Sequence, residues 1–161
     1  AGDRVSAPAV PAERWLDALV ACTLEIAATA LGCSEARVVG TREDVARGGA
    51  GAYMPLIADH SLQIALVSTE AGCQRLAKML LAMSPDDEDL PPGDVADAVG
   101  EIVNVVAGGV KARMLDVQPG LRLGLPIFLH GRIERTDHIH AVLADISLDG
   151  QAAELLVLQR I

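Results

Sequence analysis

Aromatic residues are nearly missing from this 161-residue sequence, where one Trp, one Tyr and one Phe make up 2% of the chain. Hydrophobic residues nevertheless account for 51% and charged residues for 22%, a balance typical of a globular chain and not of a disordered one. The core must therefore be built from Ala, Val, Ile and Leu. A chain of this length is sufficient for one domain with a sizeable core.

Positive charge is also scarce, because 13 basic residues face 22 acidic ones for a net charge of −9. No basic cluster suited to nucleic acid is present, and no expected helix has a Lys- and Arg-rich face for a membrane surface. The most apolar stretch, residues 15–32, is interrupted by Asp17 and Glu25, whereas a membrane span needs roughly 20 nearly uninterrupted apolar residues. We therefore expect neither nucleic acid nor membrane as a partner.

Cysteine pairs are lacking as well. Cys22, Cys33 and Cys73 are odd in number and have no CxxC spacing, which argues against a disulfide framework and against a zinc site. Buried reduced thiols are typical of a cytoplasmic protein, which is the location we expect. His138 and His140 would lie on one face of a strand and begin a metal site, but no third ligand is obvious, so we predict no metal site.

The spacing of apolar residues predicts three helices and five or six strands. The expected helices cover residues 11–31, 69–83 and 94–115, the last two capped by Thr69 and Asp94, and the expected strands cover 38–40, 52–58, 62–67, 121–130, 138–147 and 154–160.

The remaining segments are expected to be loops. Residues 1–11 are predicted to be a flexible N-terminal segment and residues 12–161 a single domain. Residues 47–51 indicate a Gly-rich turn, and residues 84–93 an acidic, solvated loop. The alternating strand at 154–160 is a candidate sheet edge.

A short internal repeat links the first and third helices. Residues 24–28 line up with residues 100–104 at a shift of 76, and Gly32 then matches Gly108. The repeat predicts a pseudo-two-fold domain. Because hairpins dominate the expected strands, we predict the α+β class, with a mostly antiparallel five- to six-stranded sheet packed against long helices.

The third helix carries a straight polar stripe opposite an apolar face. The stripe consists of Asp97, Glu101, Asn104, Gly108 and Lys111, at steps of four and three residues. One interpretation is a solvated helix face, and the other is a functional surface.

Glycines in the same helix bear on that choice. Gly100, Gly108 and Gly109 each cost about 1 kcal/mol relative to Ala in a helix interior. Their presence indicates that something comes close to this helix, which is either the neighbouring helix or a partner protein.

Residues 97–109, DAVGEIVNVVAGG, resemble the signature helix of the CheC/CheX/FliY family of chemotaxis phosphatases. The family pattern is Asp or Ser, then Glu four residues on, Asn three further, and Pro after a gap. In this sequence these positions are Asp97, Glu101, Asn104 and Pro126.

The first copy of the repeat departs from that pattern. It keeps Glu25 but has Ala28 where the second copy has Asn104. We therefore expect the first copy to have no phosphatase activity. CheC-like members carry two active motifs. A chain with a single active motif, as here, resembles the CheX branch.

The resemblance implies a CheX-like domain over residues 12–161 that hydrolyses the aspartyl phosphate of a CheY-like response regulator. Asn104 would then position the attacking water and Glu101 would dock through the regulator's lysine, while Asp97, Gly108 and Lys111 would contact the partner. The regulator would supply Mg²⁺, and the chain would need no cofactor of its own.

Two alternatives stay open within the same resemblance. One is a non-catalytic module that binds response regulators. The other is a dimeric scaffold, and the family implies a homodimer that associates through β-strands.

Overall fold

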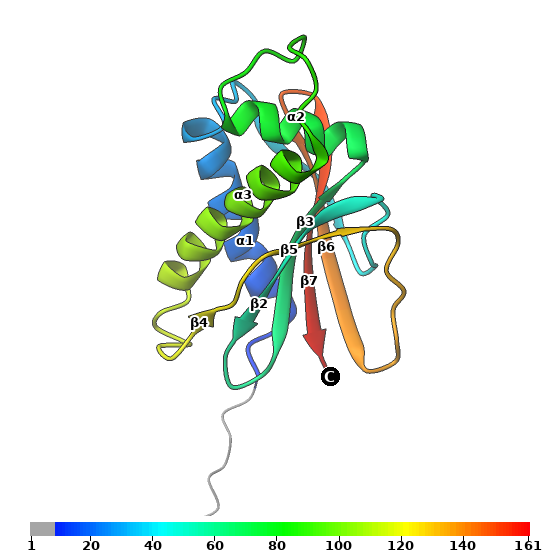
Figure 1. The fold of residues 1–161 in the computed structure, drawn as a ribbon. Helices are drawn as coiled ribbons and strands as arrows, with labels where there is room; N and C mark the ends of the chain where they lie inside the picture. Colours follow the sequence, from blue (N-terminus) through cyan, green and yellow to red (C-terminus); the bar gives the residue numbers. More distant parts are fainter. Residues whose placement is uncertain (1–8) are drawn as a thin grey trace, which may run out of the picture.

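The computed structural model describes residues 9–161, which form three helices and one seven-stranded antiparallel sheet (Figure 1). The helices are α1 (Ala12–Thr29), α2 (Glu70–Leu80) and α3 (Pro92–Arg113). The strands are β1 (Ala36–Arg42), β2 (Ala50–Ile57), β3 (Leu62–Ser68), β4 (Arg122–Leu123), β5 (Ile127–His130), β6 (Ile139–Leu148) and β7 (Gln151–Arg160). Residues 1–8 of the predicted flexible segment lie outside the described residues.

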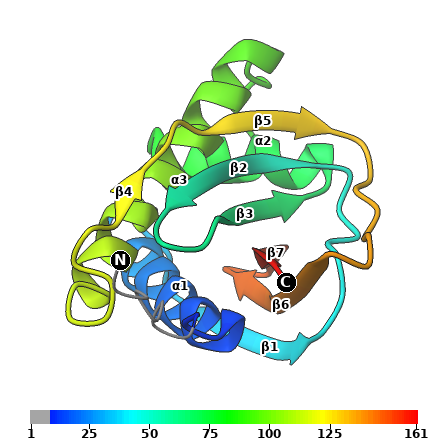
Figure 2. The same cartoon turned by 90° about the horizontal axis from the view of Figure 1, so that it is seen from below.

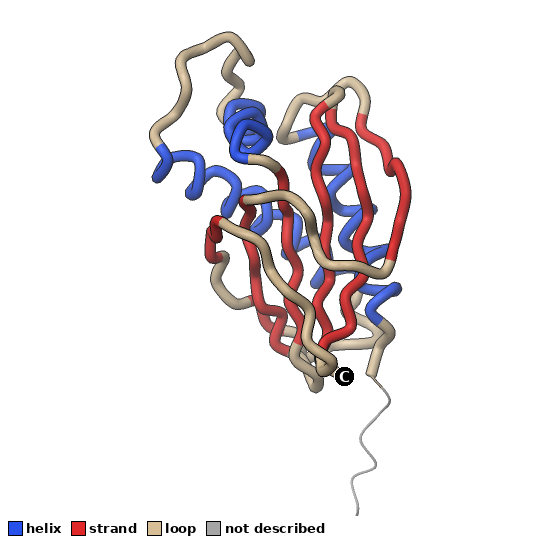
Figure 3. The backbone as a smooth tube through the Cα atoms, turned by 90° about the vertical axis from the view of Figure 1, so that its right-hand side faces the viewer, coloured by secondary structure: helices blue, strands red, loops and turns tan. Residues whose placement is uncertain are grey.

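The helices cover one face of the sheet (Figure 3). The main core lies between them and the sheet, and its largest buried side chains include Trp15, Met54 and Ile102. A smaller cluster around Tyr53 and Leu143 lies on the opposite face. The predicted α+β class is therefore confirmed, with a core of mainly aliphatic side chains.

The strand order supports the pseudo-two-fold arrangement. The order is β1-β6-β7-β3-β2-β4, with β5 also paired to β2. Exchanging β1 with β5, β2 with β6 and β3 with β7 maps this order onto itself, with the axis between β3 and β7. Figure 2 shows the matching placement of helices, with α1 beside β1 and α3 beside β4 and β5.

The sheet has seven strands and not five or six because the expected strand at 121–130 is split. Pro126 has no N–H to donate to a ladder, and it stands directly before β5. Just upstream, the backbone N–H of Gly124 donates to the carbonyl of Pro55 at 2.8 Å. A Cβ at Gly124 would collide with the Pro55 ring, so this close approach requires glycine.

The expectation that residues 154–160 form a sheet edge is wrong. β7 lies between β6 and β3, and residues 153–157 are buried. The outer strands are β1 at one end and β4 with β5 at the other. An alternating pattern does not reveal whether a strand lies at the edge or in the centre of a sheet. In this protein a second apolar cluster covers the sheet face opposite the helices, so β7 is buried on both faces.

Two helix ends also differ from expectation. Asp94 is not the N-cap of α3, because the helix begins earlier at Pro92, and a proline fits the first helical turn. The α2 helix ends at Leu80 and not at Met83, with Ala82 in the left-handed region at φ 56°. Thr69 is the N-cap of α2, as expected, and accepts a hydrogen bond from the backbone N–H of Gly72.

The two loops singled out in the sequence are held by buried charges. The backbone N–H groups of Arg47 and Gly48 donate to the carboxylate of Glu154, which lies on β7 and is buried. The acidic loop at 84–93 is mostly exposed, as expected, but the buried Lys78 ammonium donates to Asp89 at 2.9 Å and to the carbonyl of Asp87 at 2.8 Å.

Among the helices that the structure describes, none has both the length and the apolar character that crossing a membrane requires.

Candidate functional site

The polar stripe lies on the exposed face of α3. Asp97, Glu101, Asn104, Gly108 and Lys111 are all exposed. The opposite face is fully buried and consists of Val95, Val99, Ile102, Val106 and Val110. The packing of this valine-rich face on the sheet fixes the rotation of the helix and therefore points the stripe outward.

The polar and charged side chains of the stripe are not engaged within the described part of the molecule. Glu101 and Asn104 lie one helical turn apart, and neither makes a side-chain hydrogen bond or an ion pair with any described residue. The same holds, within residues 9–161, for Asp97 and Lys111. All four side chains are therefore available to a binding partner without breaking an internal contact.

The three glycines of α3 have different neighbours. A Cβ at Gly109 would lie 2.9 Å from the Sγ atom of Cys22 on α1, so Gly109 permits the close packing of the two helices. A Cβ at Gly100 would lie 3.6 Å from the ring of Pro126. A Cβ at Gly108 would meet nothing within 4 Å. Only Gly109, of the three, is required by close packing, because a Cβ at Gly100 would make an ordinary contact and a Cβ at Gly108 would face open space.

Pro126 joins the stripe although it lies far along the chain. Its ring packs over Gly100, one residue before Glu101. Next to it, Leu125 and Ile127 are 80% and 59% exposed, and Val105 on α3 is 40% exposed. Sequence reasoning missed this apolar rim. The signal available was the apolar residue on either side of Pro126.

The matching face of α1 presents a different surface. Glu25 and Ala28 are both exposed, so the repeat places them as it places Glu101 and Asn104. The Glu25 carboxylate, however, accepts from the Arg113 guanidinium at 3.4 Å. This half offers no carboxamide and no uncommitted carboxylate at these positions.

The cysteines take no part in this surface as reactive groups. All three are free and buried. Burial raises the pKa of each thiol, that of Cys73 to about 11. A thiol that resists ionisation is a poor nucleophile and a poor metal ligand, in line with the structural role expected from the sequence.

The structure does not bring the two candidate histidines together in one ligand set. His140 on β6 lies beside Glu13 and Glu43, and His138 is not part of that group. The two carboxylates near His140 come from segments that are remote along the chain, which is why the sequence did not reveal them.

Comparison with known proteins identifies the family. Residues 50–143, more than half of the chain, match the family described as chemotaxis phosphatase CheX. The chain belongs to the CheX family of chemotaxis phosphatases. The match includes α3 with its polar stripe and Pro126.

Solved CheX structures share the fold. A CheX protein from Desulfovibrio desulfuricans is 17% identical with a TM-score of 0.76, and the alignment covers 91% of this chain and 99% of that one. A CheX protein from Vibrio vulnificus is 18% identical with a TM-score of 0.74, again over 91% and 99%. The CheX of a CheX–CheY–BeF3–Mg²⁺ complex from Borrelia burgdorferi is 14% identical with a TM-score of 0.70, over 90% and 96%. No curated protein sequence matches this chain.

Proposed function

We propose that this chain hydrolyses the aspartyl phosphate of a CheY-like response regulator. The observation that carries the proposal is the exposed pair of Glu101 and Asn104, one turn apart on α3 and uncommitted to any described residue. Membership of the CheX family supports the class of reaction. The Borrelia burgdorferi CheX structure, a complex with CheY, BeF3 and Mg²⁺, supports the class of partner.

In this proposal Asn104 orients the attacking water. The carboxamide oxygen accepts a hydrogen bond from the water, which then attacks the phosphorus in line with the aspartyl oxygen. The bond from phosphorus to that oxygen breaks, which releases inorganic phosphate and restores the aspartate. Because phosphoryl transfer depends mainly on positioning and charge stabilisation, an uncharged carboxamide on a rigid helix is sufficient for this role.

Glu101 provides docking in the same proposal. Its carboxylate pairs with the active-site lysine of the regulator and fixes the register of the two proteins. Asp97 and Lys111 contact the partner at the two ends of the stripe, and Gly108 leaves room for the partner's backbone. The proposal assigns Mg²⁺ to the regulator and gives this chain no cofactor of its own.

The apolar rim supports a docking role for the whole surface. Leu125 and Ile127 are large exposed side chains next to the stripe. An apolar contact flanked by charged groups is the usual composition of a protein interface. In this proposal the apolar rim contributes buried contact area to the interface, and the polar stripe determines which partner binds.

The test is a panel of phosphorylated receiver domains mixed with this protein, in which release of inorganic phosphate and complex formation are followed separately. We expect faster phosphate release from at least one domain. Binding without faster release would favour the non-catalytic binding module, and neither binding nor release across the panel would contradict the proposal.

We also propose that the chain forms a homodimer through an outer strand. Since β7 is central, pairing must use β1, or β4 and β5. Light scattering at high micromolar concentration should give twice the monomer mass, and a monomer mass at that concentration would contradict this proposal.

A further inference from the structure

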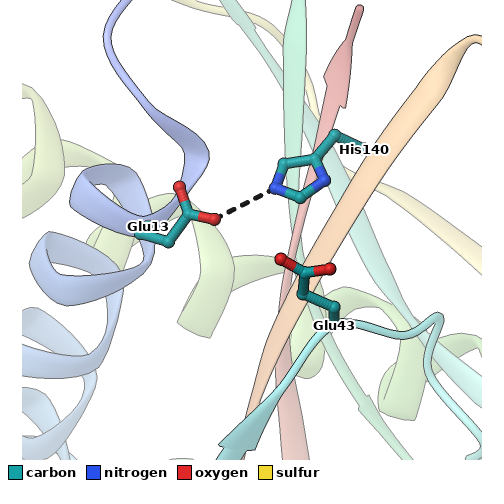
Figure 4. A group of neighbouring side chains, drawn as sticks. All are labelled: Glu13, Glu43 and His140. Atoms are coloured by element: carbon teal, nitrogen blue, oxygen red, sulfur yellow. Dashed lines mark hydrogen bonds and ion pairs between the residues drawn. The ribbon is translucent and has the colours of Figure 1, made fainter.

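Three side chains that could ligate a metal meet far from the α3 stripe, at the β1–β6 edge (Figure 4). They are Glu13 in the first turn of α1, Glu43 directly after β1, and His140 near the start of β6. One ligand atom from each lies within 4.8 Å of the others, and His140 Nε2 lies 3.0 Å from the Glu13 carboxylate. Figure 4 shows the two carboxylates and the imidazole pointing toward one another.

The fold brings these residues together through two contacts. β1 pairs antiparallel with β6, with Arg42 opposite Leu143, so the residue after β1 lies close to the beginning of β6. α1 packs against both β1 and β6, which places its first turn over the same point. The cluster therefore stands on a packed framework and not on a mobile loop.

The charges of the cluster are not balanced by a neighbouring cation. Within the described part of the chain, Glu43 makes no side-chain hydrogen bond and no ion pair. The adjacent Arg42 directs its guanidinium elsewhere, to Asp44, Asp145 and Glu154. The Glu13 carboxylate faces the same imidazole, 3.0 Å from His140 Nε2. Two carboxylates thus converge on one imidazole.

We propose that Glu13, Glu43 and His140 bind a divalent transition-metal ion such as Zn²⁺, and that the ion fastens the start of α1 to the β1–β6 edge. One imidazole nitrogen and two carboxylate oxygens suit zinc, whereas Mg²⁺ and Ca²⁺ prefer oxygen ligands alone. Tetrahedral zinc bonds of about 2.1 Å place ligand atoms about 3.4 Å apart, so small side-chain rotations would complete the site. A water would take the fourth position.

The proposed ion is an addition to a folded protein and not a requirement for folding. All three ligands lie at the edge of the domain, outside both hydrophobic clusters. The site is also separate from the proposed phosphatase surface, because it lies with α1, β1 and β6, whereas the stripe lies on α3 beside β5. Zinc should therefore change stability and not phosphate release.

The test is calorimetric titration of the metal-free protein with zinc chloride, together with thermal unfolding. We expect one saturable site per chain. At zinc concentrations of about a hundred times the dissociation constant, the unfolding temperature should rise by about 5–10 °C.

The variants His140→Ala and Glu43→Gln should each weaken zinc binding by at least about tenfold. Glu43→Gln is the sharper variant, because Glu43 has no described internal partner and its loss should leave the metal-free unfolding temperature unchanged. His138→Ala is the matched control, since it removes a histidine two residues away that is outside the cluster. Binding that is absent in the wild type, or equal in all three variants, would overturn the proposal.

Discussion

The two halves of this molecule present the same helix face with different chemistry. In the second half, Glu101 and Asn104 are exposed and uncommitted. In the first half, Glu25 occupies the matching position but is paired with Arg113, and Ala28 stands where the carboxamide would be. Both halves share the same fold and the same exposed helix face, so the fold alone does not determine where the Glu and Asn pair occurs.

The surroundings of the two helices differ as well. Gly100 lets the Pro126 ring pack onto α3 beside Glu101. The residue that matches Gly100 in the first half is Leu24, a partly buried residue with a large side chain in place of glycine. Apolar exposure at the outer strand is common to both halves, because Val39 on β1 is 61% exposed and Ile127 on β5 is 59% exposed. The two helix faces therefore differ in the polar pair and in the proline that packs at Gly100, and not in apolar exposure at the outer strand.

The largest effect is expected for Asn104→Ala. If the carboxamide orients the attacking water, its contribution is made in the transition state and hardly at all in the bound ground state. Loss of one such group typically costs about 3 kcal/mol, or about a hundredfold in rate. Phosphate release should fall by that factor, while regulator affinity and the unfolding temperature should stay near the wild-type values because Asn104 is exposed. Full activity in this variant would contradict the assignment of the chemistry to α3.

Glu101→Lys should act on docking and not on the chemical step. The new cation would face the regulator's lysine, so affinity should fall by at least about tenfold. Glu25→Lys is the matched control in the other half. It breaks an ion pair whose partners are largely exposed, and such pairs contribute little to stability. Equal losses of affinity in both variants, measured by titration with the regulator, would indicate a general charge effect and not a specific contact.

Two adjacent glycines on α3 should respond in opposite directions. Gly109→Ala places a Cβ 2.9 Å from Cys22 Sγ, and this overpacking should lower the free energy of unfolding by up to about 2 kcal/mol. Gly108→Ala meets nothing, so the better helix propensity should raise the free energy of unfolding by up to about 1 kcal/mol.

Regulator affinity separates the roles of these glycines further. Gly108→Ala should weaken docking although it stabilises the free protein, because the partner backbone is proposed to approach at that position. Denaturant unfolding and a binding titration on the same samples would measure both quantities. Unchanged affinity in Gly108→Ala would remove that residue from the docking surface.

The sequence was most informative where the pattern is local. The valine face and the polar stripe of α3 follow from helical periodicity, and the structure buries the first and exposes the second. The Thr69 cap also follows from short-range chemistry. The internal repeat predicted a pseudo-two-fold domain for the same reason, because each half repeats one local pattern, but it did not predict the strand order.

The sequence was least informative where remote segments meet. Alternation in β7 did not reveal that β6 and β3 flank it on both sides. The packing of Pro126 on Gly100 depends on the path of the chain between α3 and β5. The cluster of Glu13, Glu43 and His140 is assembled from three elements, and no spacing along the chain encodes it.

The smallest effect is expected for Ala28→Asn, which restores the missing carboxamide to the first half. The position is exposed, so the cost is mainly helix propensity, about 0.5 kcal/mol. In the wild-type background a weak second site would be hidden by the first. The informative protein is therefore the double variant Asn104→Ala with Ala28→Asn, in which any phosphate release above the Asn104→Ala level must come from α1. We expect no increase, because Glu25 stays paired with Arg113 and, among the described residues, no proline is known to pack on α1 as Pro126 packs at Gly100 on α3. Recovery of activity in the double variant would mean that a Glu and an Asn one turn apart on an exposed helix are sufficient, and that the strand beside α3 is not needed.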